Sequence, residues 1–382
     1  MSKLKLVILF VIFISNLYGG EYEDYLKQQR ESFNTYKENI NKEFKAYKKA
    51  YEESFKEYKK DITKRWPVAQ TTSKHKWVEY SKDYSTKEVI DYKKGEISLE
   101  VIAKSEKEAQ QKIINMYNKL DKYDVKQAYK NDILENKIAV KLDKVREAPK
   151  SNQKLIADII SRQQNQVIKE KLSKQKLKVV KYKGRFIYKA NIKLPANSMI
   201  KKAKFYKKYV KRQSKKLGIP QELIYAIIHS ESSFNPMARS YVPAFGLMQI
   251  VPRTAGLDTY KYLTGKRRLL SSRYLYDYKN NIIIGSTYLK ILSSRYLKNV
   301  KDPQSRLYCT IAAYNTGAGN VSRAFNGTTN IYKSARVINK MSSDQVYKRL
   351  MKKLPRNETK RYLYKVNNRI SIYHKLIKDN RL

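Results

Sequence analysis

The spacing of apolar side chains changes along this chain, and each change restricts the elements that its residues can form. Between residues 22 and 62, aromatic and aliphatic residues recur at spacings of 3, 4 and 4, a period that matches about 3.67 residues per turn. This predicts a long amphipathic helix over residues 21–66 that Pro67 ends. Its aromatic stripe can pack on its own chain, on a second copy or on a partner.

Residues 67–195 have a different pattern of apolar and polar residues. Over residues 77–102, apolar and polar residues alternate on either side of Gly95, which indicates a hairpin. Two more strands are predicted around Gly184, and residues 104–175 return to a helical pattern. We therefore expect an α+β domain in which helices pack on a small antiparallel sheet.

Residues 196–382 indicate an all-helical domain with one helix of special interest. Pro220 suits the first turn of a helix, and Ile224, Ile227 and Ile228 line one face. Glu231 follows Ile224 by seven residues, so its carboxyl lies on that apolar face, near the C-terminal end. Burial and the negative end of the helix dipole both raise a carboxyl pKa. Such an acid can be a proton donor, but a hydrogen-bonded structural glutamate is the alternative.

The first 20 residues have the layout of a secretory signal peptide: Lys3 and Lys5, an apolar run over residues 6–14, then small or polar residues. An uncleaved anchor is the alternative. No cysteine follows the run, so a lipoprotein anchor is not expected. We expect export to the periplasm or cell envelope.

The net charge of the chain and its few cysteine and histidine residues limit the partners and metal sites that it can have. The chain has 82 Lys+Arg against 34 Asp+Glu, a net charge of +48, which attracts polyanions or an anionic envelope surface. Because the chain is expected to be exported, nucleic acid is not expected to be its natural partner. The single cysteine, Cys309, excludes an internal disulfide, and the three histidines are scattered. We therefore predict no metal site and no cofactor.

Four short motifs follow one another along residues 196–382: "ESSF" at 231–234, "FGLMQIVP" at 245–252, "AAYNTGAGNV" at 312–321 and "ETKRYLYKV" at 358–366. In this order they resemble the lytic murein transglycosylase family, whose catalytic domain has a lysozyme-like (goose-type lysozyme or SLT) fold. The segments flanking them, and more loosely the N-terminal half, resemble its membrane-bound C type. That type is usually a lipoprotein, so the missing cysteine puts its membrane attachment in doubt here.

The resemblance implies cleavage of the MurNAc-β-1,4-GlcNAc bond of peptidoglycan without water, leaving 1,6-anhydro-MurNAc ends. Glu231 is implied as the general acid and then the base, with Ser232 supporting the loop that follows. The common two-carboxylate hydrolases need a second acid beside the bond. None of the motifs supplies one near the expected sugar, since Glu358 belongs to a distant segment and is expected to be structural. The implied substrate-binding residues are Ser240, Gly246, Met248, Gln249, Tyr314, Asn315 and Tyr362.

Two other functions stay open. A goose-type muramidase has the same fold and single glutamate, but it releases a reducing sugar. A non-catalytic peptidoglycan-binding scaffold keeps the fold without the reaction. The stem peptides of peptidoglycan carry carboxylates, which suits the dispersed lysines of this chain.

Overall fold

The computed structural model describes residues 27, 31, 34–35, 38–241 and 243–382. The chain divides into two compact units, residues 1–54 and 55–382. Residues 38–63 are helical. The predicted signal peptide and the start of the predicted helix over 21–66 lie outside the described residues. The full length of that helix and its aromatic stripe therefore stay a prediction.

The last turns of this helix, residues 55–63, belong to the second unit and pack on its sheet. Tyr58 and Ile62 are buried, and the Tyr58 ring lies 6.2 Å from the ring of Tyr80 in an edge-on arrangement. Elsewhere on these turns, the carboxylate of Glu57 forms an ion pair of 2.8 Å with Lys141. These turns are therefore apolar toward the sheet and charged where they meet solvent.

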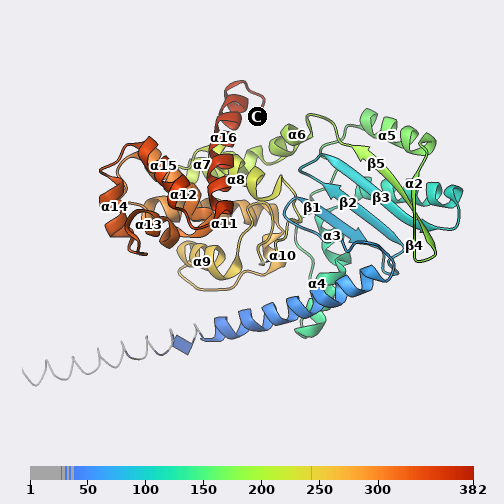
Figure 1. Cartoon of the computed structure of the whole chain (residues 1–382), viewed down its shortest axis with the longest axis horizontal. Helices are drawn as coiled ribbons and strands as arrows, with labels where there is room; N and C mark the ends of the chain where they lie inside the picture. Colours follow the sequence, from blue (N-terminus) through green and yellow to red (C-terminus); the bar gives the residue numbers. More distant parts are fainter. Residues whose placement is uncertain (1–26, 28–30, 32–33, 36–37, 242) are drawn as a thin grey trace, which may run out of the picture. The chain divides into compact units, whose positions relative to one another are not determined.

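Five antiparallel strands form one sheet in the part of the chain that the structure describes, in the order β1-β2-β3-β5-β4 (Figure 1). The predicted hairpins around Gly95 and Gly184 are confirmed as β2–β3 and β4–β5. Both glycines have a φ near +70°, at +68° and +75°, which glycine adopts without strain. The strands are β1 Lys76–Tyr80, β2 Thr86–Asp91, β3 Glu96–Ala103, β4 Lys178–Tyr182 and β5 Arg185–Lys193.

Helices follow the third strand, and α2 packs on the sheet as the sequence predicts. The longest of them, α2, begins after Ser105, whose side chain accepts a hydrogen bond from the Glu108 backbone N–H. Its buried side includes Ala109, Ile113 and Tyr117, and it contacts β3 and α5. The helices of this part are α2 Glu106–Lys122, α3 Val125–Asn131, α4 Ile133–Lys141 and α5 Arg162–Lys174.

Helices and turns, without a strand, make up the described residues from 198 onward, which confirms the all-helical prediction. Helix α8 packs against α16, and α16 also contacts α12 (Figure 1). The elements are α6 Ser198–Phe205, α7 Lys207–Leu217, α8 Gln221–Ser232, η1 Pro252–Gly256, α9 Leu257–Thr264, α10 Ser272–Leu275, α11 Tyr278–Ile291, η2 Leu292–Tyr296, α12 Pro303–Thr316, α13 Ala318–Asn326, α14 Ile331–Ile338, α15 Ser343–Lys353 and α16 Asn357–Lys378.

Two buried acids oppose each other across the first two strands, Glu79 on β1 and Glu88 on β2. Burial raises the pKa of Glu79 to about 7 and that of Glu88 to about 8. The Glu79 carboxylate contributes to the raised pKa of Glu88, because like charges disfavour ionisation. Folded-state pKa values above the ordinary value of 4.5 mean that the folded state binds these protons more tightly. Stability is therefore lost as the pH rises from about 4.5 through these values.

We expect Glu88→Gln to be more stable than the wild type at pH 9, by at least about 1 kcal/mol, because the amide needs no ionisation in a buried site. Near pH 4 the difference should disappear. Thermal unfolding at both pH values measures it, with Glu96→Gln, an exposed glutamate of β3, as the matched control. A difference independent of pH would show that the buried pair does not titrate.

Candidate active site

Helix α8 carries Glu231 into the interior. The helix follows Pro220 and ends at Ser232, and the C-cap residue Ser233 has a left-handed φ of +52°. Ile224, Ile227 and Ile228 are fully buried, and Glu231, in the last turn of the helix, is 4% exposed. The apolar face of the helix thus holds a carboxyl group where the spacing from Ile224 predicts it.

The surroundings of Glu231 act on its pKa in both directions. Burial is the largest influence and raises the pKa. The ammonium of Lys74 and a hydrogen bond from Tyr362 lower it, and the Glu358 carboxylate adds a smaller upward contribution. The net direction is upward, which favours the protonated acid that a proton donor requires.

Lys74 is a residue that the sequence analysis missed. Its ammonium nitrogen lies 3.5 Å from Oε2 of Glu231, although the two residues stand 157 positions apart in the chain. In a chain with 82 Lys+Arg, one lysine ahead of a strand has no distinguishing pattern. The strand β1 that follows it could have directed attention to the segment, but not to the contact.

Two tyrosines predicted at the site flank Glu231 from different helices. The Tyr362 hydroxyl, on α16, is buried and makes no hydrogen bond of ordinary geometry within the described residues. It nevertheless lies close enough to lower the Glu231 pKa as a donor. The Tyr314 hydroxyl, on α12, donates to the Met248 carbonyl at 2.8 Å. The Glu231 carboxylate contributes to the raised pKa of both tyrosines. Tyr314 thus joins the surroundings of the acid to the 245–250 loop.

The 245–250 loop is held by Asn281 of α11, a second residue that the sequence analysis missed. Its side-chain amide donates to the carbonyls of Phe245 and Leu275, both at 2.8 Å. Its Oδ1 accepts from the Met248 backbone N–H at 2.8 Å. Asn281 lies on the same helix as the buried residues Ile282, Ile284 and Leu289. A buried amide needs hydrogen-bond partners, and this was the available signal.

Gln249 and Gly246 lie in this loop with left-handed backbones, at φ of +48° and +74°. Left-handed geometry is uncommon for a non-glycine residue and tends to occur at functional sites. Gln249 donates from Nε2 to the Gly246 carbonyl at 3.1 Å. Its Oε1 is buried without a partner among the described residues. That acceptor suits an N–H donor from a ligand.

The remaining predicted residues lie around these groups, with one correction. The Met248 side chain is fully buried, and its sulfur lies against Gly285 of α11, so it packs in the core rather than on a surface for sugar. Ser232 accepts from the Phe234 backbone N–H at 3.1 Å and donates to the Ile228 carbonyl. Ser240 is half-buried, and its backbone N–H donates to Ala244 at 3.2 Å.

A cleft of about 430 Å³ adjoins this loop. It brings together Gln249, Tyr314 and Asn315, three of the predicted residues. Asn315 accepts from the Thr359 hydroxyl at 2.7 Å, which fixes its amide. Asp258 also lies in the lining, where it accepts from the Tyr296 hydroxyl at 3.2 Å. The cleft therefore offers amides, a phenol and a carboxylate, the groups that hydrogen-bond sugars. Its full lining is Gln249, Val251, Thr254, Ala255, Asp258, Tyr288, Leu292, Tyr296, Tyr314, Asn315, Thr316, Gly317, Ala318, Gly319 and Ile331.

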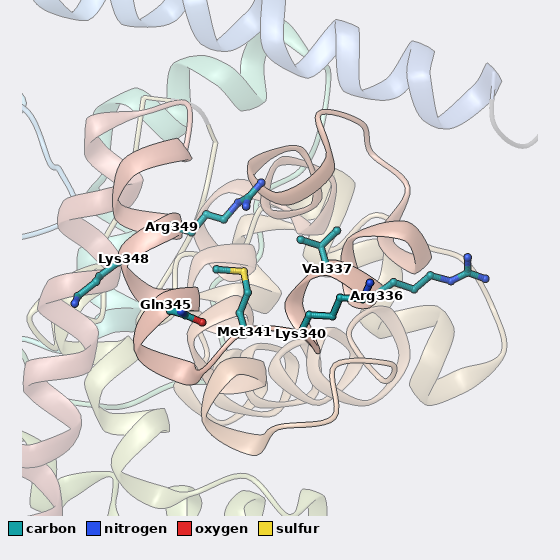
Figure 2. Close-up of a pocket in the computed structure, with 7 residues that line it drawn as sticks. All are labelled: Arg336, Val337, Lys340, Met341, Gln345, Lys348 and Arg349. Carbon is teal, nitrogen blue, oxygen red and sulfur yellow. The ribbon is translucent and has the colours of Figure 1, made fainter.

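A larger pocket of about 580 Å³ lies between α14 and α15 and contains none of the predicted residues (Figure 2). Its rim is strongly basic, but Arg349 is committed to the Ala324 and Phe325 carbonyls, and Arg336 contacts Tyr332. It is lined by Arg336, Val337, Lys340, Met341, Gln345, Lys348 and Arg349. The 430 Å³ cleft, by contrast, is linked to Glu231 through Tyr314, which lines the cleft and whose pKa the Glu231 carboxylate helps to raise.

Across residues 38–241 and 243–382, no three His, Cys, Asp or Glu side chains are grouped as metal ligands would be. Within the described residues, every helix is too short or too polar to cross a bilayer.

Comparison with known proteins gives consistent matches. Residues 208–336 match the transglycosylase SLT domain family. A membrane-bound lytic murein transglycosylase C from Sodalis glossinidius is 45% identical over 184 residues, 48% of this chain and 51% of that protein. The protein of the same name from Klebsiella pneumoniae is 42% identical over 191 residues, 50% of this chain and 52% of that one. The chain thus matches about half the length of these curated relatives, and the predicted likeness of its N-terminal half stays a prediction.

Proposed function

We propose, from the match of residues 208–336 to the transglycosylase SLT domain family, that this chain is a peptidoglycan lytic transglycosylase. Its substrate would be the glycan strand, cut between MurNAc and GlcNAc without consumption of water. The observation that carries the proposal is the nearly buried Glu231, 4% exposed, whose pKa is raised chiefly by burial. The adjoining cleft includes Tyr314, whose own pKa responds to the Glu231 carboxylate.

In this reaction Glu231 first gives its proton to the glycosidic oxygen, and the bond between that oxygen and C1 of MurNAc breaks. The MurNAc O6 hydroxyl then forms a bond to C1 as its proton passes to Glu231. The carboxyl thus ends protonated, and the sugar ends as a 1,6-anhydro ring. The raised pKa favours the first step, and the Lys74 ammonium, 3.5 Å away, stabilises the carboxylate between the two steps.

The neighbouring side chains have roles that their contacts suggest. The unpartnered Oε1 of Gln249 can accept the N–H of an acetamido group, and Asn315, fixed by Thr359, can bond a hydroxyl. The Tyr362 hydroxyl can donate to Glu231 or to the sugar. Tyr314 holds the 245–250 loop through the Met248 carbonyl. Ser240 and the backbone at Gly246 are proposed to contact the glycan.

The setting of the enzyme follows from its substrate. Peptidoglycan lies outside the cytoplasmic membrane, and the relatives are named membrane-bound, so we place this chain in the cell envelope. Its net charge of +48 would retain it at anionic wall and membrane surfaces, and this retention should weaken with salt.

Mass spectrometry of the products tests the proposal. Purified sacculi are incubated with the wild type and with Glu231→Gln, and the masses of the soluble muropeptides are measured. We expect 1,6-anhydro-MurNAc ends from the wild type only. Products heavier by one water would mean a muramidase, with Asp258 of the cleft as the first candidate for its second carboxylate. Binding to sacculi without any product would mean a scaffold.

A further inference from the structure

The segment ahead of β1 lies against the loop that follows the catalytic helix. The Asn235 side chain donates to the Ser73 and Lys74 carbonyls at 3.3 and 3.4 Å, and the Arg239 backbone N–H donates to Ser73 at 3.4 Å. The Ser233 hydroxyl lies 3.1 Å from Nδ1 of His75. Backbone carbonyls on both sides of the Lys74 Cα are therefore held, so this segment has a fixed position at the active site.

Ion pairs also join the loop after α8 to the sheet-containing part of the chain. The Arg239 guanidinium contacts Glu135 at 3.0 Å and Asp132 at 3.2 Å, and Arg239 is 2% exposed. Removing one partner of such a buried pair is strongly destabilising, because it leaves an uncompensated charge. The sheet-containing part is thus fixed against the helical part beside the loop that carries Ser233.

Lys74 uses this fixed position to reach the acid. Its side chain is 34% exposed, while that of Glu231 is 6% exposed, and the two charges are 3.5 Å apart. The ammonium keeps contact with water, so its desolvation is partial. The carboxylate has little water of its own, and the lysine supplies the compensating charge.

We propose that Lys74 is a positioning residue for the lytic reaction, and that the sheet-containing N-terminal part thereby completes the active site of the helical part. The inference rests on the proposed function. Its consequence is that residues 196–382 alone lack one component of the site, although all the motifs lie within them. The N-terminal part then has a direct role in the chemistry in addition to any role in binding the wall.

The chemistry depends on the balance of charges that face Glu231. Lys74 faces it from the segment ahead of β1, Tyr314 from α12, and Tyr362 and Glu358 from α16. When the acid gives up its proton, negative charge appears in a site with little water, and the ammonium is the cation that opposes it. Burial and Glu358 raise the Glu231 pKa, and the Lys74 ammonium lowers it. Without Lys74, Glu231 would therefore hold its proton more tightly.

Substitution of Lys74 tests this through the pH profile. We expect Lys74→Met to lower the maximal rate of muropeptide release about tenfold or more, since one preorganised charge is lost. The alkaline limb of kcat/KM, which reports loss of the protonated acid, should move upward by about one pH unit. Lys74→Arg should keep the limb near that of the wild type. The matched control is Lys76→Met, two residues along, whose partner is Asp91 at 3.2 Å.

A second measurement does not depend on activity. Carbon-13 NMR of protein labelled at the glutamate carboxyl carbons gives the Glu231 pKa directly, with the signal assigned by its loss in Glu231→Gln. A higher pKa in Lys74→Met than in the wild type and Lys76→Met supports the inference, and an unchanged pKa overturns it. If the wild type releases no product, the proposed function fails, and this titration still decides whether Lys74 controls the acid.

Discussion

Glu231→Gln should release soluble muropeptides from sacculi at least about 10²- to 10⁴-fold more slowly than the wild type, the usual contribution of a general acid or base. The amide keeps the shape of the side chain but has no proton to give to the glycosidic oxygen. The initial rate of product release measures the loss. Glu358→Gln is the matched control, because Glu358 is the exposed carboxylate that contributes to the raised pKa of Glu231. It should retain activity within a few-fold.

Glu231→Gln should also stabilise the protein. A loss of activity in this variant can therefore be distinguished from a loss of folding. Burial raises the folded-state pKa of Glu231, so the folded state binds the proton more tightly than the unfolded chain. Stability is therefore lost as the pH rises from the ordinary value of 4.5 to the higher folded value. At pH 7 we expect Glu231→Gln to gain about 1 kcal/mol, and near pH 4 to gain little.

Thermal unfolding at the two pH values measures this gain. Lys74, 34% exposed at its side chain, can be solvated when its partner becomes neutral, so the variant should not lose stability through it. An inactive variant that is also less stable at pH 7 would mean that Glu231 is a structural residue, and the assignment of the acid would fail.

Gly246→Ala should destabilise the protein by about 3 kcal/mol, through two separate effects. The φ of +74° costs a residue with a Cβ about 1 to 2 kcal/mol. A Cβ there would also lie 2.5 Å from the Leu275 carbonyl oxygen and against the Asn281 amide. Crowding of this kind costs about 1 to 3 kcal/mol more. The glycine is thus required by the Asn281 contact, in addition to any approach of sugar.

Gly265→Ala separates the two effects. Gly265 has nearly the same φ, +73°, but a Cβ there would meet nothing within 4 Å, so about 1 kcal/mol is expected from the backbone alone. Urea unfolding of both variants measures the difference. Equal losses would mean that the 245–250 loop shifts to make room, and that Asn281 does not fix it tightly.

Several parts of the site follow from local sequence. The position of Glu231 on a buried helix face depends on the 3.6-residue period, and the hairpins at Gly95 and Gly184 depend on alternation and turn residues. These patterns are properties of neighbouring residues, so they can be read before the chain is folded. The motifs that resemble the transglycosylases also lie in single short segments.

Other parts were decided by packing between distant segments. Lys74 meets Glu231, and Asn281 meets the 245–250 loop, through contacts that no period encodes. Met248, predicted at the sugar, lies buried against Gly285 because the loop turns its side chain inward.

Local patterns in the sequence predict the helix that carries Glu231, the hairpins at Gly95 and Gly184, and the family that residues 208–336 resemble. The pairing of β1 with the first hairpin, which makes the sheet five-stranded, was not predicted. The groups that surround the Glu231 carboxyl depend on how distant segments pack. The pKa of a buried carboxyl depends on charges within a few ångströms. Lys74, the cation that forms an ion pair with Glu231, comes from a segment 157 residues earlier in the chain.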